Sequence, residues 1–437
     1  MAEALPVVEV AYGRSACGLR LPAGTEVIQP VPGDARAVPA SRDPGAHDVP
    51  DPLGVVADAL DRPVGLPPLE VLARGRSHVT VVVPDPTRPA AAATYLLPIL
   101  ARLARAGHGP SSIRVLVARG IHAAAARDEV EAVVGPEVMA ALRPLQSAPD
   151  LPEWNEPIAE DPQLGTVRVH RLVADAGLVL LTGAVTPHHL AGFGGGAKAL
   201  VPGTADRDTV LAAHRLTLRT LVRPDGSLAH VAGRLEANPF REALLRVARA
   251  FGRCALLNVV LDRRQRIVGA AYGEVGEAHA QACARWRAVH APVEPQPCDL
   301  VVAGVASPRA DDLVQAHKAL IAASAWARPG APIAWLVQAS HGAGHPEFLP
   351  WFESGRLERH LAALRRSFHP YGLTAYSVRR IAAGHPVVTA SEVSADILRG
   401  MGLLPCASPQ AALDHALGLA RPQGKALRVA VLADAGA

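Results

Sequence analysis

The chain is poor in lysine. Only Lys198, Lys318 and Lys425 occur among its 44 basic residues, so arginine fills nearly every position where any cation would serve. Arginine stays protonated in proteins, whereas lysine can lose its proton and form a covalent bond. We therefore expect lysine to persist where an amine is required. Lys198, directly after a glycine run, is the strongest functional candidate. The occurrence of lysine at position 425 is interpreted as chance.

Other absences narrow the class of protein. The five cysteines form no C-x-x-C pair, which is typical of reduced thiols in a cytoplasmic protein. The net charge of +4 is spread along the chain without a basic block, so nucleic acid is not an expected partner. We expect no signal peptide, and no apolar run approaches the roughly 20 residues that span a membrane. A cytoplasmic protein without a membrane partner is therefore predicted.

Apolar strands alternate with helical segments over the first two thirds of the chain. Three continuous apolar runs, at residues 79–85, 113–120 and 177–183, are typical of buried parallel strands, and each precedes a loop. Alternating segments predict β-hairpins at residues 5–30 and 254–273. This pattern predicts an N-terminal α/β domain over residues 1–290.

A proline-dense segment, APVEPQPCD at residues 291–299, is interpreted as a linker. The strand–helix pattern then restarts, which predicts a second α/β domain over residues 300–437. The expected fold class is thus α/β: two α/β domains with mostly parallel sheets and an active-site cleft between them.

Polar side chains follow the predicted parallel strands. The sequence Asp85-Pro86-Thr87-Arg88-Pro89 ends the first strand, and His122 and His188 follow the next two. Arg88 could hold a carboxylate or phosphate, while helix capping by Asp85 or Thr87 is the alternative. Because parallel strands end at one edge of a sheet, the two imidazoles could share a crevice and perform acid–base chemistry.

The glycine run before Lys198 fits two familiar motifs poorly. Ala197 and Ala199 flank the lysine, which excludes a P-loop. Gly192–Ala197 follows the G-x-G-x-x-A spacing of a dinucleotide site but does not directly follow a strand end. We interpret the glycines as allowing close approach of a flat or phosphorylated ligand, with a flexible loop as the alternative. His214, on the helix expected after Asp206 or Asp208, either binds a metal or packs.

In the second domain, Gln315 and Lys318 lie three residues apart on one predicted helix face. Lys318 is another of the few lysines, so a role at the interdomain cleft is expected. The alternative is a solvated helix face, to which we assign His317.

These motifs together resemble the nickel-dependent lactate racemase family, and the resemblance covers nearly the whole chain. They occur in the following order: Tyr12-Gly13, the D-x-T-R-P of Asp85–Pro89, the G-x-H of Gly120–His122, the P-H-x-x-A-G-F-x-G-G-x-K of Pro187–Lys198, Pro202-Gly203, His214, Asn238-Pro239 and the Q-x-x-K of Gln315–Lys318.

The resemblance implies a nickel-pincer nucleotide, pyridinium-3,5-bisthiocarboxylic acid mononucleotide nickel, supplied by cofactor-biosynthesis enzymes. Lys198 would tether one sulfur-containing arm, and His214 would be the protein ligand to nickel. The implied roles of the remaining residues are cofactor binding by Asp85, Pro86, Thr87 and Arg88, acid–base chemistry by His122 and His188, and substrate binding by Arg88, Gln315 and Lys318.

The activity implied is racemisation or epimerisation of a small 2-hydroxy acid by reversible hydride transfer. Ala123 and Ala197 replace residues that are commonly arginine in the family. Val314 replaces an aromatic residue, which predicts an altered substrate pocket and a larger acid than lactate, such as a sugar acid. Two alternatives are an NAD-dependent oxidoreductase using Gly192–Ala197, and a non-catalytic nickel or cofactor carrier of the same fold.

Overall fold

The computed structural model describes residues 5–29, 50–88, 90–262, 264–423 and 426–435, so Pro89 and Lys425 lie outside the described residues. The chain forms two compact units. The described part of the central unit comprises residues 50–220 and Val231–Ala291, and that of the terminal unit comprises residues 5–29, Leu221–His230 and the chain from Pro292 onward. The sequence pattern predicted one domain over residues 1–290. In the structure the N-terminal hairpin belongs instead to the terminal unit, because its first strand pairs with a strand of that unit.

The central unit is built on a six-stranded sheet in the order β13-β12-β9-β4-β5-β6. Only the β12–β13 hairpin is antiparallel, and the predicted strands and hairpin of this unit are confirmed. The strands are β4 (Val79–Pro84), β5 (Ile113–Ala118), β6 (Leu145–Gln146), β9 (Leu178–Ala184), β12 (Cys254–Leu261) and β13 (Ile267–Gly273).

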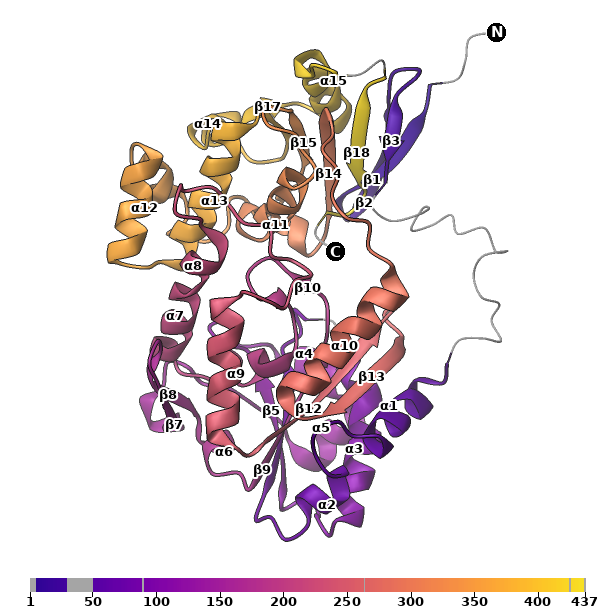
Figure 1. Ribbon diagram of the computed structural model, residues 1–437, viewed down its shortest axis with the longest axis vertical. Helices are drawn as coiled ribbons and strands as arrows, with labels where there is room; N and C mark the ends of the chain where they lie inside the picture. The colour runs from indigo at the N-terminus through magenta and orange to yellow at the C-terminus, as the bar shows by residue number, and fades with distance from the viewer. Residues whose placement is uncertain (1–4, 30–49, 89, 263, 424–425, 436–437) are drawn as a thin grey trace. The chain divides into compact units, whose positions relative to one another are not determined.

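Helices cover both faces of this sheet (Figure 1), because continuous apolar strands present buried side chains on each side. Val81 and Val83 face one core, and the intervening Val82 faces the other. The first core takes in α1 (Pro52–Asp61), α2 (Leu69–Ala73), α3 (Ala92–Arg105), α4 (Arg127–Val134) and α5 (Pro136–Leu142). The second takes in α6 (Arg171–Ala174), α7 (Arg207–Arg215), α9 (Pro239–Phe251) and α10 (Val275–His290).

Several smaller elements of the central unit were not expected from the sequence. An antiparallel hairpin of β7 (Asn155–Asp161) and β8 (Gly165–His170) precedes β9, and a short pair, β10 (Pro187–His188) and β11 (Gly192–Phe193), follows it. Two 3-10 helices, η1 (Pro152–Trp154) and η2 (Gly196–Ala199), and the short α8 (Thr217–Leu221) complete the list.

The terminal unit contains an eight-stranded sheet with the path β17-β16-β15-β14-β1-β2, and β18 pairs with both β14 and β3. The only antiparallel neighbours among these described strands are β1 and β2. The strands are β1 (Val7–Gly13), β2 (Ser15–Arg20), β3 (Glu26–Ile28), β14 (Leu300–Ala306), β15 (Ile333–Leu336), β16 (Val387–Ala390), β17 (Leu404–Cys406) and β18 (Arg428–Leu432).

The helices of the terminal unit pack on this sheet and on one another. They are η3 (Arg309–Asp311), α11 (Leu313–Ser324), η4 (Leu349–Glu353), α12 (Leu357–Arg366), α13 (Pro370–Gly384), α14 (Ala395–Gly400) and α15 (Pro409–Leu419). The predicted α/β class with mostly parallel sheets is therefore confirmed. Among the described residues, no helix combines the length and the apolar character needed to cross a membrane.

Candidate active site

The candidate catalytic residues leave one edge of the central sheet. Strand β4 lies between β5 and β9 and runs parallel to both, with Pro84 opposite Ala118 and Val82 opposite Leu181. Their carboxyl ends therefore lie side by side, where ligands of parallel α/β sheets usually bind. The prediction that these strand ends share an edge is confirmed.

Asp85 orients His122. Its Oδ2 accepts a hydrogen bond from Nδ1 of His122 at 3.1 Å, and its Oδ1 accepts from the backbone N of Thr87 at 2.8 Å and from the Thr87 hydroxyl. Burial alone would raise the pKa of Asp85, but these hydrogen bonds and the positive charges of His122 and Arg88 lower it overall. The capping alternative is wrong, because α3 begins at Ala92 without a side-chain cap.

This pair leaves His122 ready to accept a proton. Because Nδ1 donates to the carboxylate, the neutral ring keeps its lone pair on Nε2. The His122 side chain is 42% exposed and that of Asp85 only 8%, so the imidazole is accessible while its partner is buried.

His188 has the opposite tautomer. Its Nδ1 accepts hydrogen bonds from the backbone N of Leu190 at 3.1 Å and of Ala191 at 3.2 Å. The proton of the neutral ring is then on Nε2. The ring also stacks on His189 with centroids 4.9 Å apart, which restricts its orientation. His122 thus presents an acceptor at Nε2, and His188 presents a donor there.

His214 is a neutral imidazole whose Nε2 carries a lone pair instead of a proton. On helix α7, its Nδ1 donates to the backbone O of Val210 at 2.8 Å. Burial, together with the positive charges of Lys198, His122 and Arg88, lowers the pKa of His214 to about 4. A neutral imidazole whose other nitrogen donates to a carbonyl is the usual arrangement of a metal-binding histidine.

The glycines before Lys198 accommodate protein atoms. Gly192, Gly195 and Gly196 all have positive φ angles. An added Cβ would lie 2.6 Å from Oδ1 of Asn258 at Gly195, and 2.7 Å from Nδ1 of His279 at Gly196. At Gly192 it would lie 1.6 Å from a backbone oxygen. The interpretation that these glycines make room for a ligand was therefore wrong.

Asn258 and His279, which the sequence analysis missed, hold the loop that carries Lys198. Asn258 accepts from the backbone N of Gly196 and donates to the backbone O of Gly183, both at 2.9 Å. Nε2 of His279 donates to the backbone O of Gly194 at 2.9 Å. Asn258 could have been suspected, because it is a polar residue inside the apolar run CALLNVVL.

The local fold does not form a dinucleotide fingerprint. That motif needs a glycine turn between a strand end and a full helix. Here the β10–β11 pair separates β9 from the remaining glycines, and these lead into the four-residue 3-10 helix η2. The geometry therefore gives the NAD-dependent alternative no support.

Gln315 and Lys318 lie on α11 in the terminal unit and contact each other. Nζ of Lys318 donates to Oε1 of Gln315 at 2.7 Å, and the Gln315 backbone N donates to the capping carboxylate of Asp312 at 2.7 Å. The assignment of His317 to a solvated face was wrong: it is 5% exposed, and burial lowers its pKa to about 3.

The residues fit a metal ion whose other ligands come from a cofactor. Among the described residues, no group of three or more His, Cys, Asp or Glu side chains is arranged to hold a metal ion. A metal chelated by a cofactor needs only one protein ligand, and Nε2 of His214 is suited to that role. Lys198, on η2 of the same unit, has the kind of amine with which a cofactor could be tethered.

The fold and these residues define a class: a two-unit α/β protein with two oriented histidines at the carboxyl edge of a parallel sheet. Residues 26–223 match the model of the lactate racemase N-terminal domain family. The resemblance to the lactate racemase family is thus confirmed, and that segment carries the family's N-terminal domain.

Similar proteins extend the match over most of the chain. The chain is 26% identical to lactate racemase of Thermoanaerobacterium thermosaccharolyticum over 391 residues, 88% of each chain. It is 27% identical to lactate racemase of Lactiplantibacillus plantarum over 387 residues, 87% of this chain and 88% of that one. The solved structure of the T. thermosaccharolyticum lactate racemase apoprotein superposes with a TM-score of 0.83 at 24% identity, covering 98% of both chains, and supports the fold.

The buried neutral state of His214 predicts an acid-sensitive fold. Its pKa is about 4 in the folded protein against 6.5 for an unperturbed side chain, so the unfolded chain binds this proton more tightly. Stability should therefore fall as the pH drops from about 6.5 toward 4. Between pH 7 and pH 4.5, the free energy of unfolding should fall by about 2 kcal/mol less in the His214→Gln variant than in the unaltered protein. Urea unfolding at several pH values measures it, and an unchanged pH dependence in the variant would contradict it.

Proposed function

We propose that the protein racemises or epimerises a small 2-hydroxy acid, using a nickel-pincer nucleotide supplied by cofactor-biosynthesis enzymes. The observation that carries this proposal is the pair of histidines with opposite tautomers, His122 accepting at Nε2 and His188 donating from Nε2. The lactate racemases that resemble the chain support it. A reaction that interconverts two enantiomers needs proton transfer in both directions, which suits two such groups.

When bound, the nickel-pincer nucleotide supplies a hydride acceptor. His214 would ligate the nickel through Nε2, Lys198 would tether the nucleotide, and the turn of Asp85, Pro86, Thr87 and Arg88 would hold it. Asp85 and His214 thereby have different tasks. The carboxylate keeps His122 oriented, and burial keeps His214 neutral at pH 7.

The proton follows a simple route. Nε2 of His122 removes the hydroxyl proton of one enantiomer as the hydrogen at C2 departs with its electron pair. The resulting 2-keto acid is planar at C2, so hydride can return to either face. The carbonyl oxygen of the keto acid then takes a proton from Nε2 of His188 and becomes the hydroxyl of the opposite enantiomer, and proton exchange with solvent returns both histidines to their starting states. The imidazolium of His122 is stabilised by the buried carboxylate of Asp85.

Arg88, Gln315 and Lys318 would bind the substrate. A guanidinium binds a carboxylate with two hydrogen bonds, and Lys318 with its bonded Gln315 offers an ammonium and an amide. Val314, beside Gln315, stands where the family has an aromatic residue, so we propose an acid larger than lactate or differently shaped, such as a sugar acid. A panel of enantiopure 2-hydroxy acids would measure this preference, and lactate as clearly the best substrate would contradict it.

Hydride transfer predicts that the hydrogen at C2 is kept. With cofactor-loaded protein in D2O, an enantiopure substrate should racemise without gaining deuterium at C2, because that hydrogen never exchanges with solvent as a proton. Chiral chromatography with mass spectrometry measures both quantities, and substrate deuterated at C2 serves as the control that should keep its label. Racemisation with solvent deuterium at C2 would instead indicate proton abstraction from carbon and overturn the hydride mechanism.

The two histidines should be needed for turnover but not for cofactor binding. His122→Ala and His188→Ala should each lower racemisation at least 100-fold, since positioned acid–base groups contribute about 10²–10⁴-fold. His415→Ala is the control, because it removes an exposed imidazole on α15 that contacts neither of the two histidines. Activity and nickel content are measured on the same samples. Loss of nickel in both catalytic variants would show structural or ligating roles.

Lys198 should carry the tether. Protein co-produced with the cofactor-building enzymes should show a nickel-containing adduct in its native mass spectrum, and the organic part should stay on Lys198 after denaturation. Lys198→Arg keeps the charge but cannot form the bond at neutral pH, so the adduct should disappear on denaturation. An adduct that survives denaturation in this variant would place the bond elsewhere.

A further inference from the structure

The turn that carries His122 is held by an arginine that the sequence pattern did not single out. Arg119 directly follows β5 and is half-buried. Its Nε donates to the backbone O of Ser147 at 2.7 Å, and its Nη1 donates to the backbone O of His122. One planar guanidinium therefore joins the His122 turn to the segment that follows β6, and it restrains the backbone from which the imidazole extends.

Ser147 connects this arginine to a second support. Its hydroxyl accepts from the backbone N of Arg119 at 3.2 Å and donates to the backbone O of Gly203 at 3.1 Å. The same oxygen of Gly203 accepts from the backbone N of Gly120 at 2.9 Å. The turn is thus held at its start through Gly120 and at its end through the backbone O of His122.

Gly203 extends these contacts to the loop of Lys198. Its backbone N donates to the backbone O of Lys198 at 3.0 Å, while its own O faces the His122 turn. A Cβ added at Gly203 would lie 2.4 Å from the backbone O of Ala199 and 3.0 Å from the Cβ of Ala118. Only glycine therefore fits between η2 and the end of β5, and its two backbone groups connect these segments.

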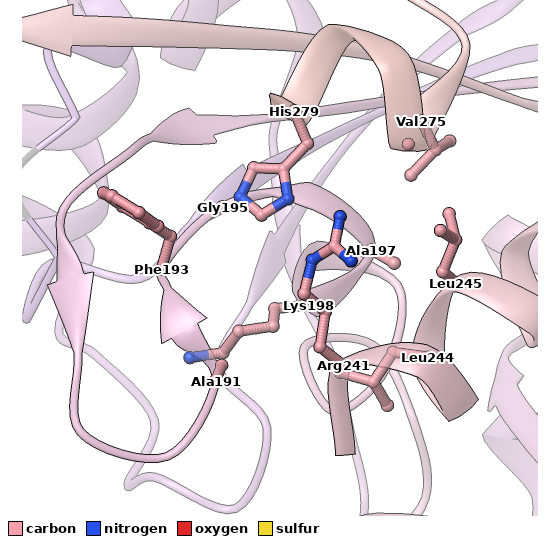
Figure 2. A pocket seen from close by; sticks show the side chains of 11 residues that line it. Ala191, Phe193, Gly195, Ala197, Lys198, Arg241, Leu244, Leu245, Val275 and His279 are labelled. Carbon is pink, nitrogen blue, oxygen red and sulfur yellow. The ribbon is translucent and has the colours of Figure 1, made fainter. Parts of the chain in front are cut away.

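The pocket beside η2 has no space for part of a cofactor (Figure 2). Its volume is about 10 Å³, which is room for one water molecule at most. Figure 2 shows the Lys198 side chain extending away from His279. The contacts that position this lysine act on the backbone: Gly203 bonds its carbonyl, and Asn258 and His279 hold the glycines before it.

We propose that Arg119 is a positioning residue for proton transfer, which holds the His122 turn where Nδ1 of His122 meets the carboxylate of Asp85. This role rests on the proposed function, in which His122 accepts the substrate proton. Asp85 follows β4 and His122 follows β5, so their contact of 3.1 Å persists only while the backbone of the turn stays in place. Arg119 supplies that restraint, and the proton position on His122 depends on it.

Nitrogen-15 NMR of histidine-labelled protein, purified without cofactor supply, tests the state of the ring. At mildly alkaline pH, His122 of the unaltered protein should carry its proton on Nδ1, and the His122→Ala spectrum identifies its signals by their absence. In Arg119→Gln the turn should relax and the tautomer with the proton on Nε2 should become populated, because the hydrogen bond at one nitrogen sets the tautomer. An unchanged His122 spectrum in this variant would overturn the proposal.

Turnover of cofactor-loaded protein shows whether the restraint matters for the chemistry. Arg119→Gln should lower kcat about 10–100-fold with KM and nickel content unchanged, because a misplacement of about 1 Å can cost about 100-fold. Arg119→Lys keeps the charge and one donor group, so it should recover part of the loss. An unchanged kcat in Arg119→Gln, or loss of nickel together with activity, would contradict a positioning role.

Arg253→Gln is the matched control. Nη1 of Arg253 also donates to two backbone oxygens, those of Ala174 and Ala176 at 3.3 Å each, but these lie before the amino ends of β9 and β12. Urea unfolding should show a loss of stability like that of Arg119→Gln, while the His122 spectrum and kcat should match the unaltered protein. Equal effects of both variants on the spectrum and on kcat would make Arg119 structural and overturn the proposal. The NMR result does not require turnover, so an inactive unaltered protein would contradict the proposed function alone.

Discussion

The site depends on the parallel pairing of β5, β4 and β9. This pairing brings Asp85 beside His122 and places His188 at the same edge of the sheet. A strand rises about 3.3 Å per residue, so a shift of two residues between β4 and β5 would move the carboxylate about 6.6 Å and break its 3.1 Å contact with the imidazole. The proton position on His122 is therefore a consequence of backbone register.

Much of this edge could be predicted from the sequence, because its signals are local. Continuous apolar runs mark the buried strands, and the polar residues that follow them mark the strand ends. The scarcity of lysine singled out Lys198 by the chemistry of its amine. What the runs could not reveal is which nitrogen of each imidazole carries the proton. That depends on a carboxylate 37 residues away for His122, and on two backbone N–H groups in a short hairpin for His188.

The supports of the Lys198 loop were not predictable in this way. Asn258 and His279 lie on β12 and α10, 60 and 81 residues beyond the lysine, and act through hydrogen bonds to backbone atoms. Such contacts leave no periodic pattern in the sequence from which they could be predicted. The glycines were misinterpreted for the same reason: the atoms that forbid a Cβ come from distant segments.

The placement of β1 has a consequence for the order of folding. Tyr12 and Gly13 pair with Val305 and Ala306, nearly 300 residues later, so β1 and its hairpin partner β2 wait for that part of the chain before β1 meets its parallel neighbour β14. The strands around Asp85, His122 and His188 need only partners from within the central unit. During synthesis, this edge of the central sheet can thus assemble while the N-terminal hairpin is still without its sheet, since domains generally fold as units. Such long-range closure is slow, and it makes the terminal unit the last part of the molecule to form.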